Sequence, residues 1–260
     1  MKQYINNFKK YRFLLEQLIK KEIKLKYRNS FLGIFWTLLE PLLTMIVLTI
    51  VFKEMRGREQ DFPIYVLSGR LIYSFFSAAT KASTRAIRSN SSMIKKVYVP
   101  KYIYPISSIF ANYVIFLISL VDLVVVAIFL KVYPTKYLIN SILPLILVLL
   151  LSIGVGLLLA TFSVFFRDLE YLWSVALTFI MYTSAIFYSV DSMVKNADSM
   201  KIWIFKLNPV YAIIVNFRNS IYGKPLDMFA LNYATIFSVV TIAIGVYSFY
   251  KKQDKFILNI

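Results

Sequence analysis

Two charged side chains interrupt otherwise apolar stretches of the chain, and they are the first candidates for chemistry. Glu40 lies in the middle of the mainly apolar stretch from Phe31 to Phe52 and directly precedes Pro41, and Arg70 lies in the next apolar stretch. A charge near the centre of a bilayer costs several kcal/mol unless it is paired or hydrated. In two antiparallel helices the two charges would differ in depth by only about 5 Å. Glu40 and Arg70 are therefore expected to form an ion pair or, alternatively, Glu40 faces a water-filled passage.

Few other residues are suited to catalysis. The chain contains neither cysteine nor histidine, which excludes disulfides, thiol nucleophiles, Cys/His zinc sites and histidine acid–base chemistry. A membrane-embedded transferase would need clustered acidic residues, and the sequence offers only Asp168 and Glu170, which we interpret as capping or packing residues. No phosphate-binding loop with G-x-x-x-x-G-K-[ST] or G-x-G-x-x-G spacing occurs. We therefore expect no catalytic residue, metal site or cofactor in this chain.

The composition indicates that these charges belong to a membrane protein. Of 260 residues, 59% are hydrophobic, and the mean hydropathy is +0.66, against about 45–50% apolar residues in soluble domains. Six apolar stretches are long enough to cross a bilayer as helices. We predict an all-α polytopic protein whose single transmembrane domain covers 29–260, with spans near 31–52, 62–82, 103–130, 138–164, 171–190 and 229–250.

The positions of the basic residues predict the orientation. The net charge is +17, and with a cytoplasmic N-terminus 19 of the 30 Lys and Arg residues fall in inner segments and 10 in outer ones. This asymmetry favours a multi-pass protein of the cell membrane with both termini in the cytoplasm. It also argues against nucleic-acid binding, because the basic residues cluster between apolar spans rather than on one domain face.

Residues 1–28 are predicted to form a separate cytoplasmic element. Leu15, Ile19 and Ile23 fall on one helical face, and Lys24 falls on the opposite, basic face. Such a pattern is typical of an amphipathic helix lying on the membrane surface. It serves either as a topological anchor alone or also as a contact for a partner.

The inner segment between the second and third spans predicts a short helix over 89–97. Serines supply possible N-caps, and Pro100 ends the element. Apolar side chains on such a short exposed helix favour insertion into another protein, and the alternative is a solvated basic loop. The residues concerned are Ser89, Ser91, Ser92, Met93, Ile94, Lys95, Lys96 and Val97.

The last outer segment holds two apolar pieces, 202–205 and 210–217, which are too short to span the membrane. With the break at Asn208-Pro209, they predict a re-entrant helical hairpin over 202–222. Flat aromatic rings suit weak stacking against sugar rings. Most aromatic residues belong to interface belts or to packing, and the candidates for lining a passage are Trp36, Phe76, Tyr182 and Phe187.

Four blocks of the sequence resemble the permease subunits of type-2 ABC exporters. The similarity is to the branch that exports O-antigen, capsular polysaccharide, teichoic acid and related surface polymers, and it covers nearly the whole chain in order. The blocks are IKLKYRNSFLGIFWTLLEPLLTMIVLTIVF, NSSMIKKVYVPKYIYPISSIFANYVIF, FRDLEYLWSVALTFIMYTSAIFYSV and LNPVYAIIVNFRNSIYG.

The resemblance implies a homodimer bound to two copies of an ATP-hydrolysing subunit, which would hold ATP and Mg. It implies that residues 89–97 form the helix that couples to the ATPase, that residues 13–27 also contact it, and that the hairpin over 202–222 borders the exit. Glu40-Pro41 stands where many relatives have Asn-Pro. The implied function is ATP-driven export of a lipid-linked polysaccharide or teichoic-acid-type polymer. The alternatives are a type-2 exporter of drugs or small lipids and an ion-coupled carrier, although no internal repeat supports the latter.

Overall fold

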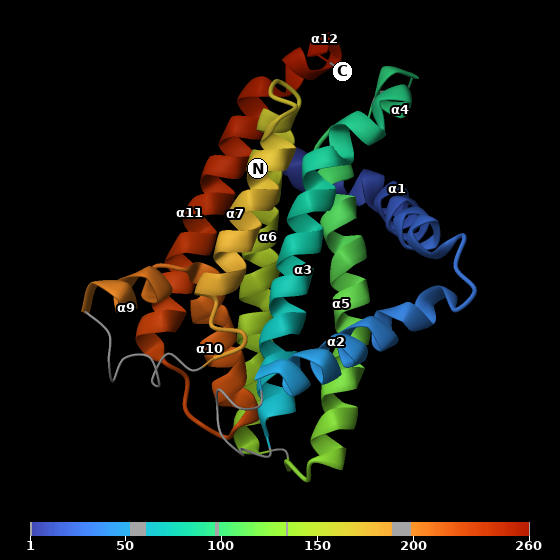
Figure 1. Ribbon diagram of the computed structural model, residues 1–260. Helices are drawn as coiled ribbons and strands as arrows, with labels where there is room; N and C mark the ends of the chain where they lie inside the picture. Colours follow the sequence, from blue (N-terminus) through green and yellow to red (C-terminus); the bar gives the residue numbers. More distant parts are fainter. Residues whose placement is uncertain (1, 53–60, 97–98, 134, 189–198, 260) are drawn as a thin grey trace.

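The computed structural model describes residues 2–52, 61–96, 99–133, 135–188 and 199–259, and every regular element in these ranges is a helix (Figure 1). Four helical segments among them are long and apolar enough to cross a membrane: Gly33–Phe52, Ile103–Phe129, Lys136–Ser163 and Met228–Asn259. The chain is therefore an all-α polytopic membrane protein, as predicted. The two other predicted spans, 62–82 and 171–190, also form helices, but these are not among the four apolar segments. α3 (Phe62–Ser89) carries several charges, and α7 (Leu169–Thr183) has only 15 residues.

The centre of the molecule is a bundle of α3, α5 (Ile103–Phe129), α6 (Ile142–Ser163) and α11 (Met228–Lys252). α3 packs against both α5 and α6, and α6 packs along α11. α3 is amphipathic, so one broad face is buried in the core while its charged residues lie on the remaining face. α6 is preceded by the 3₁₀ turn η3 (Lys136–Ser141) and is apolar around most of its circumference.

Small residues set the distance between α6 and α11. A Cβ atom added to Gly154 would lie 2.6 Å from the backbone nitrogen of Ile242, and one added to Gly245 would lie 2.6 Å from the carbonyl oxygen of Gly154. The two backbones therefore touch at a point that only glycine permits. Two residues further along α6, the Ser83 hydroxyl of α3 donates a hydrogen bond to the carbonyl of Gly156 at 2.9 Å.

α2 (Trp36–Phe52) follows the short turn η1 (Gly33–Phe35) and continues through Pro41. Proline has no N–H, so the carbonyl of Thr37, four residues earlier, lacks its helical hydrogen bond. Ser119 of α5 donates its hydroxyl to that carbonyl at 2.9 Å. In lipid an unsatisfied backbone group is costly. The proline defect in α2 is therefore repaired by α5, which also fixes where α2 docks.

α1 (Lys2–Tyr27) lies across the outside of the bundle and packs on α5 (Figure 1). Leu15 and Leu18 are buried at this contact, whereas Ile19 and Ile23 are only partly buried and Lys24 is exposed. Polar contact also contributes, because the Ser108 hydroxyl donates to the Glu22 carboxylate at 2.6 Å. The predicted apolar stripe is thus used mainly against the protein's own α5.

One end of the molecule gathers α4 (Ser91–Lys96), η4 (Gln253–Lys255) and α12 (Phe256–Asn259), as Figure 1 shows. α4 and α12 share a second hydrophobic cluster, here called the end cluster. Phe256 is fully buried in it, 5.2 Å from Phe249 between ring centroids, and the Lys101 ammonium donates to the carbonyl of Gln253 at 2.6 Å. Its buried members are Leu15, Leu18, Ala86, Ile87, Ile94, Ile103, Tyr104, Leu157, Ala160, Val164, Phe249 and Phe256.

Towards the other end, α9 (Ser199–Lys206) and α10 (Pro209–Ile221) are separated by a break at Asn208. The Asn208 side chain accepts a hydrogen bond from the N–H of Val210 at 2.9 Å and so caps α10. α10 is largely buried against its neighbours, and its Arg218 guanidinium donates to the carbonyls of Tyr65, Ala185 and Ile186 at 2.9–3.2 Å. Arg218 therefore holds the turn after α7 against α3.

Candidate functional site

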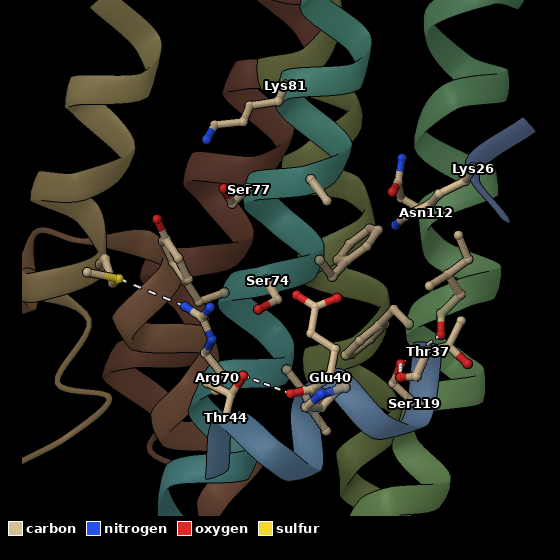
Figure 2. A pocket seen from close by; sticks show the side chains of 18 of the residues that line it. Lys26, Thr37, Glu40, Thr44, Arg70, Ser74, Ser77, Lys81, Asn112 and Ser119 are labelled. Atoms are coloured by element: carbon tan, nitrogen blue, oxygen red, sulfur yellow. Dashed lines mark hydrogen bonds between the residues drawn. The ribbon is translucent and has the colours of Figure 1, made fainter. Parts of the chain in front are cut away.

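A polar cavity of about 430 Å³ opens where α2 crosses the bundle. Its walls come from the end of α1 and from α2, α3, α5 and α7, and Figure 2 shows its side chains. Both intramembrane charges highlighted by the sequence, Glu40 and Arg70, line it. The polar residues in its walls are Lys26, Tyr27, Thr37, Glu40, Thr44, Arg70, Tyr73, Ser74, Ser77, Lys81, Asn112 and Ser119.

Glu40 and Arg70 do not form the hypothesised ion pair in this structure. No pair within 4.0 Å joins these two described residues. Arg70 instead points its guanidinium at the sulfur of Met181, 3.9 Å away, and lies 6.0 Å from the centre of the Tyr73 ring. The Glu40 carboxylate points toward the α3 ribbon beside Ser74 (Figure 2). The arrangement corresponds to the alternative interpretation, in which Glu40 faces a hydrophilic space.

Lys26 brings a further charge to the rim of this cavity from the end of α1. Burial lowers the pKa of the Lys26 ammonium, and the nearby Glu40 carboxylate opposes this shift by favouring the charged form. Burial and the same carboxylate both raise the pKa of the Tyr27 phenol. The negative charge of Glu40 therefore acts on both residues at the end of α1.

The predicted 89–97 helix forms as α4, but its apolar side chains do not project freely. Ile94 is buried in the end cluster with 7% exposure, and Met93 packs partly against that cluster. The expectation of an exposed apolar knob is wrong for Ile94, because the 12-residue cluster provides it with intramolecular partners. Ser89, Ser92, Lys95 and Lys96 are exposed, Ser91 is partly buried, and Val97 lies outside the described residues. A partner docking on α4 would meet a polar, basic surface.

An ion-pair network joins α3 to α7 at the same end. The Glu170 carboxylate accepts hydrogen bonds from Arg85 and, at 3.4 Å, from Arg88. Glu170 thus acts as an ion-pair partner rather than as the capping or packing residue that was expected. Asp168 precedes α7 but makes no side-chain cap, so capping is not its role here.

The four aromatic candidates for the passage do not meet in one place. Phe76 packs in the core against Trp173 with a centroid distance of 6.3 Å, and Phe187 stacks on Phe52 at 5.2 Å. Both are buried and cannot line a passage in this conformation. Trp36 and Tyr182 are exposed, yet neither lies in the cavity wall. The aromatic rings that do line the cavity belong to Tyr27, Tyr73, Phe75 and Phe116.

Sequence reasoning missed the hydroxyl, amide and lysine residues of the cavity. Ser74, Ser77 and Lys81 follow Arg70 at steps of four, three and four residues, which places them on one face of α3. That spacing was present in the sequence. Polar residues at helical intervals are therefore the signal that identifies this face of α3.

The family model of the ABC-2 type transporter matches residues 14–222. The chain belongs to this family. This matched region includes the cavity, α4 and the α9–α10 pair.

Curated relatives of this ABC-2 transporter cover almost its whole length. It is 27% identical over 227 residues to the O-antigen export system permease protein RfbA of Myxococcus xanthus, covering 87% of this chain and 86% of that one. The RfbA protein of Klebsiella pneumoniae is 25% identical over 94% of this chain and 93% of its own length. The polysialic acid transport protein KpsM of Escherichia coli is 24% identical, with 98% of each chain covered.

Proposed function

We propose that this chain is the membrane-embedded permease subunit of an ATP-driven exporter of cell-surface polysaccharide. The observation that carries the proposal is the combination of an ABC-2 transporter match over residues 14–222 with relatives that are named for O-antigen export and polysialic acid transport. Their alignment along nearly the whole chain includes the polar cavity. A type-2 exporter of drugs or small lipids is the alternative, and the RfbA and KpsM relatives described above favour the polysaccharide function instead.

The energy for transport comes from a separate ATP-binding subunit, which holds ATP and Mg. This chain contains no phosphate-binding loop. Two copies of the chain and two copies of the ATPase would form the complete exporter. In that complex the exposed polar side of α4 and the basic face of α1 receive the movement of the ATPase, because both elements join the end cluster that reaches into α3, α5, α6 and α11.

The proposed topology has six crossings, formed by α2, α3, α5, α6, α7 and α11. α1 then lies on the cytoplasmic surface with α4 and α12, and both termini are cytoplasmic. α9 and α10 form a re-entrant pair at the outer side. Their capped break at Asn208 and the burial of α10 support a short, fixed hairpin rather than a solvated loop.

The side chains that line the polar cavity would form part of the wall of the export passage. Its hydroxyl, amide and aromatic groups suit a glycan carried on a lipid, because hydrogen-bonding side chains and flat rings can contact sugars without holding them tightly. In the dimer two such walls would face one passage. A long polymer needs a continuous passage of this kind rather than a closed binding pocket.

Deleting the gene in its native host tests the proposal. The expected result is loss of surface polysaccharide and accumulation of the lipid-linked polymer inside the cell. A plasmid copy of the gene is expected to restore the surface polysaccharide and remove the accumulated polymer. The measurement is the carbohydrate composition of the intact cell surface and of the cytoplasmic membrane fraction. Unchanged surface polysaccharide together with a new sensitivity to drugs would contradict the proposal and favour the alternative exporter.

A further inference from the structure

Residues 253–259, here called the strap, follow α11 at the end of the molecule where α4 also lies (Figure 1). They form only the short turns η4 and α12, which have too few internal hydrogen bonds to hold themselves in place. Within the strap Phe256 is fully buried, whereas Lys255, Ile257 and Leu258 are exposed. The position of the strap therefore depends on what Phe256 and its neighbours contact.

Phe256 contacts residues from two separate connections of the chain. The centre of its ring lies 6.0 Å from that of Phe165, which belongs to the connection between α6 and α7, and the two rings meet edge to face. The Lys101 ammonium, from the connection between α4 and α5, also lies 6.0 Å from the centre of the Phe256 ring. With Phe249 of α11 stacked edge-on at 5.2 Å, one side chain joins three distant parts of the sequence.

Two polar contacts fix the strap at the same places. The Lys101 ammonium, which is partly buried, donates to the backbone carbonyl of Gln253 at 2.6 Å. Lys252, the last residue of α11, places its ammonium 4.1 Å from the centre of the Phe162 ring near the end of α6 and 5.7 Å from that of Phe165. Charge-assisted hydrogen bonds and cation–π contacts are stronger than their neutral counterparts. The strap is thus attached on one side to the turn before α5 and on the other to the end of α6.

These two attachment points belong to different packed pairs of helices. α3 packs most extensively against α5, and α6 packs most extensively along α11. α4 lies in the chain between α3 and α5. A displacement of α4 therefore acts through the chain on the α3–α5 pair alone, and the α6–α11 pair follows only through contacts between the pairs. The strap adds such a contact directly beside α4.

We infer that Phe256 and Lys101 are positioning residues for energy coupling. They hold the turn before α5 against the ends of α6 and α11, so that a displacement of α4 by the ATPase moves both helix pairs together. Close-packed side chains transmit displacement because they have no free volume to absorb it. The inference rests on the proposed function and adds which residues convey the movement within this chain. Neither of these two described residues lines the polar cavity.

Phe256 is suited to this role because it is the only member of the end cluster that the strap supplies. Removing its ring releases the strap, while the other buried members keep their contacts with one another. The bond from Lys101 goes to a backbone carbonyl, so it reports the position of the strap rather than the identity of a side chain. Both residues therefore govern the same joint from opposite sides.

The test uses the permease–ATPase complex in vesicles that contain radiolabelled lipid-linked polysaccharide. Three quantities are measured for each variant: the Kd between permease and ATPase, the rate of ATP hydrolysis, and the amount of polymer exported per ATP. In Phe256→Ala and in Lys101→Gln the Kd is expected to stay unchanged and hydrolysis to continue, while the polymer exported per ATP falls by about fivefold or more. A merely structural role would lower hydrolysis and export by the same factor and leave their ratio unchanged.

Matched controls come from the strap itself. Leu258→Ala shortens a side chain of α12 that is 85% exposed, and Lys255→Gln removes an exposed ammonium. Both controls are expected to keep the wild-type ratio of polymer to ATP. Lys101→Arg retains a charged donor and is expected to restore most of the ratio. The double variant Phe256→Ala/Lys101→Gln is expected to be no worse than the more severe single variant, because both changes open one joint.

Several results would overturn the inference. These are a wild-type ratio in either Phe256→Ala or Lys101→Gln, an equal fall in Leu258→Ala, or a Lys101→Arg protein no better than Lys101→Gln. Loss of ATPase binding in both variants would also overturn it, because the residues would then shape the docking surface instead. If Phe256→Ala fails to fold, Lys101→Gln decides alone, since its side chain is only partly buried.

Failure of the strap is distinct from failure of the proposed function. A wild-type complex that exports polysaccharide with ATP, together with variants that keep the same ratio of polymer to ATP, would refute the strap and leave the permease function standing. Absence of ATP-dependent export of polysaccharide by the wild-type complex would refute the function, and the inference with it.

Discussion

Ser119 of α5 donates a hydrogen bond to the backbone carbonyl of Thr37 in α2, at 2.9 Å. This carbonyl is the one that Pro41 deprives of its partner within the helix. Only 11% of the most apolar window of this segment is buried in the chain, so α2 has few apolar contacts to hold it. The side-chain hydrogen bond therefore contributes to both the continuity and the docking of α2.

Replacing Ser119 with Ala is expected to destabilise the folded chain by about 1–2 kcal/mol, because the Thr37 carbonyl is left without a donor. The same change made in a Pro41→Ala background is expected to cost less, since the backbone N–H of residue 41 then satisfies that carbonyl. The coupling between the two residues is measured by unfolding the wild type, the two single variants and the double variant in detergent. Additive effects of the two changes would show that Ser119 does not compensate for the proline.

Substitutions on α4 are expected to distinguish its role in folding from its role in the contact with the ATPase. Ile94→Asp places a charge in the end cluster and is expected to destabilise the protein by about 3 kcal/mol or more. Lys96→Glu changes only an exposed side chain, so the protein folds normally but ATP-driven export falls at least severalfold. Protein yield and thermal midpoint are measured beside export. Full export by a folded Lys96→Glu protein would remove this side chain from the contact with the ATPase.

The glycine contact between α6 and α11 predicts a strict size limit. Gly154→Ala places a methyl group about 2.6 Å from backbone atoms of α11, so we expect a loss of roughly 1–3 kcal/mol as the helices move apart. Ala243→Ser adds an atom to an exposed position of α11 and serves as the matched control. Thermal midpoints of the purified proteins test the difference. A stable Gly154→Ala protein would mean that α6 and α11 are not held this closely.

Arg218 is expected to be a structural residue despite its charge. It is 5% exposed, its guanidinium lies 3.4 Å from the centre of the Tyr65 ring, and it donates to three carbonyls. Arg218→Leu is expected to cost about 3 kcal/mol, because buried carbonyls lose charged donors. Arg12→Leu, at an exposed position, is the control. Equal unfolding of both variants and the wild type would contradict this role.

The sequence was sufficient to predict the class of fold and most helices. Long apolar stretches define α2, α5, α6 and α11 to within a few residues, because span length and hydropathy depend on local sequence alone. The break at Asn208-Pro209 was also predictable from local rules, since asparagine caps a helix and proline suits its first turn.

Tertiary partners were not predictable in the same way. Ile94 looked exposed because its partners, such as Leu15 and Phe256, are more than 70 residues away in sequence. The Glu40–Arg70 pairing was argued from depth alone, and depth does not fix how two helices are rotated or crossed. The aromatic candidates failed for a similar reason, because composition does not distinguish a ring packed in the core, such as Phe76, from one that faces a cavity, such as Tyr73.

The central claim is that this chain provides the passage and another subunit provides the energy. Its most direct test is reconstitution of the purified permease and its ATPase in vesicles that contain the radiolabelled lipid-linked polysaccharide of the host. The account predicts that the polymer crosses the membrane only when both proteins and ATP are present, as measured by its exposure to an impermeant glycosidase, and that the permease alone hydrolyses no ATP. Transfer of the polymer by the ATPase with an unrelated membrane protein, or ATP hydrolysis by the permease alone, would contradict it.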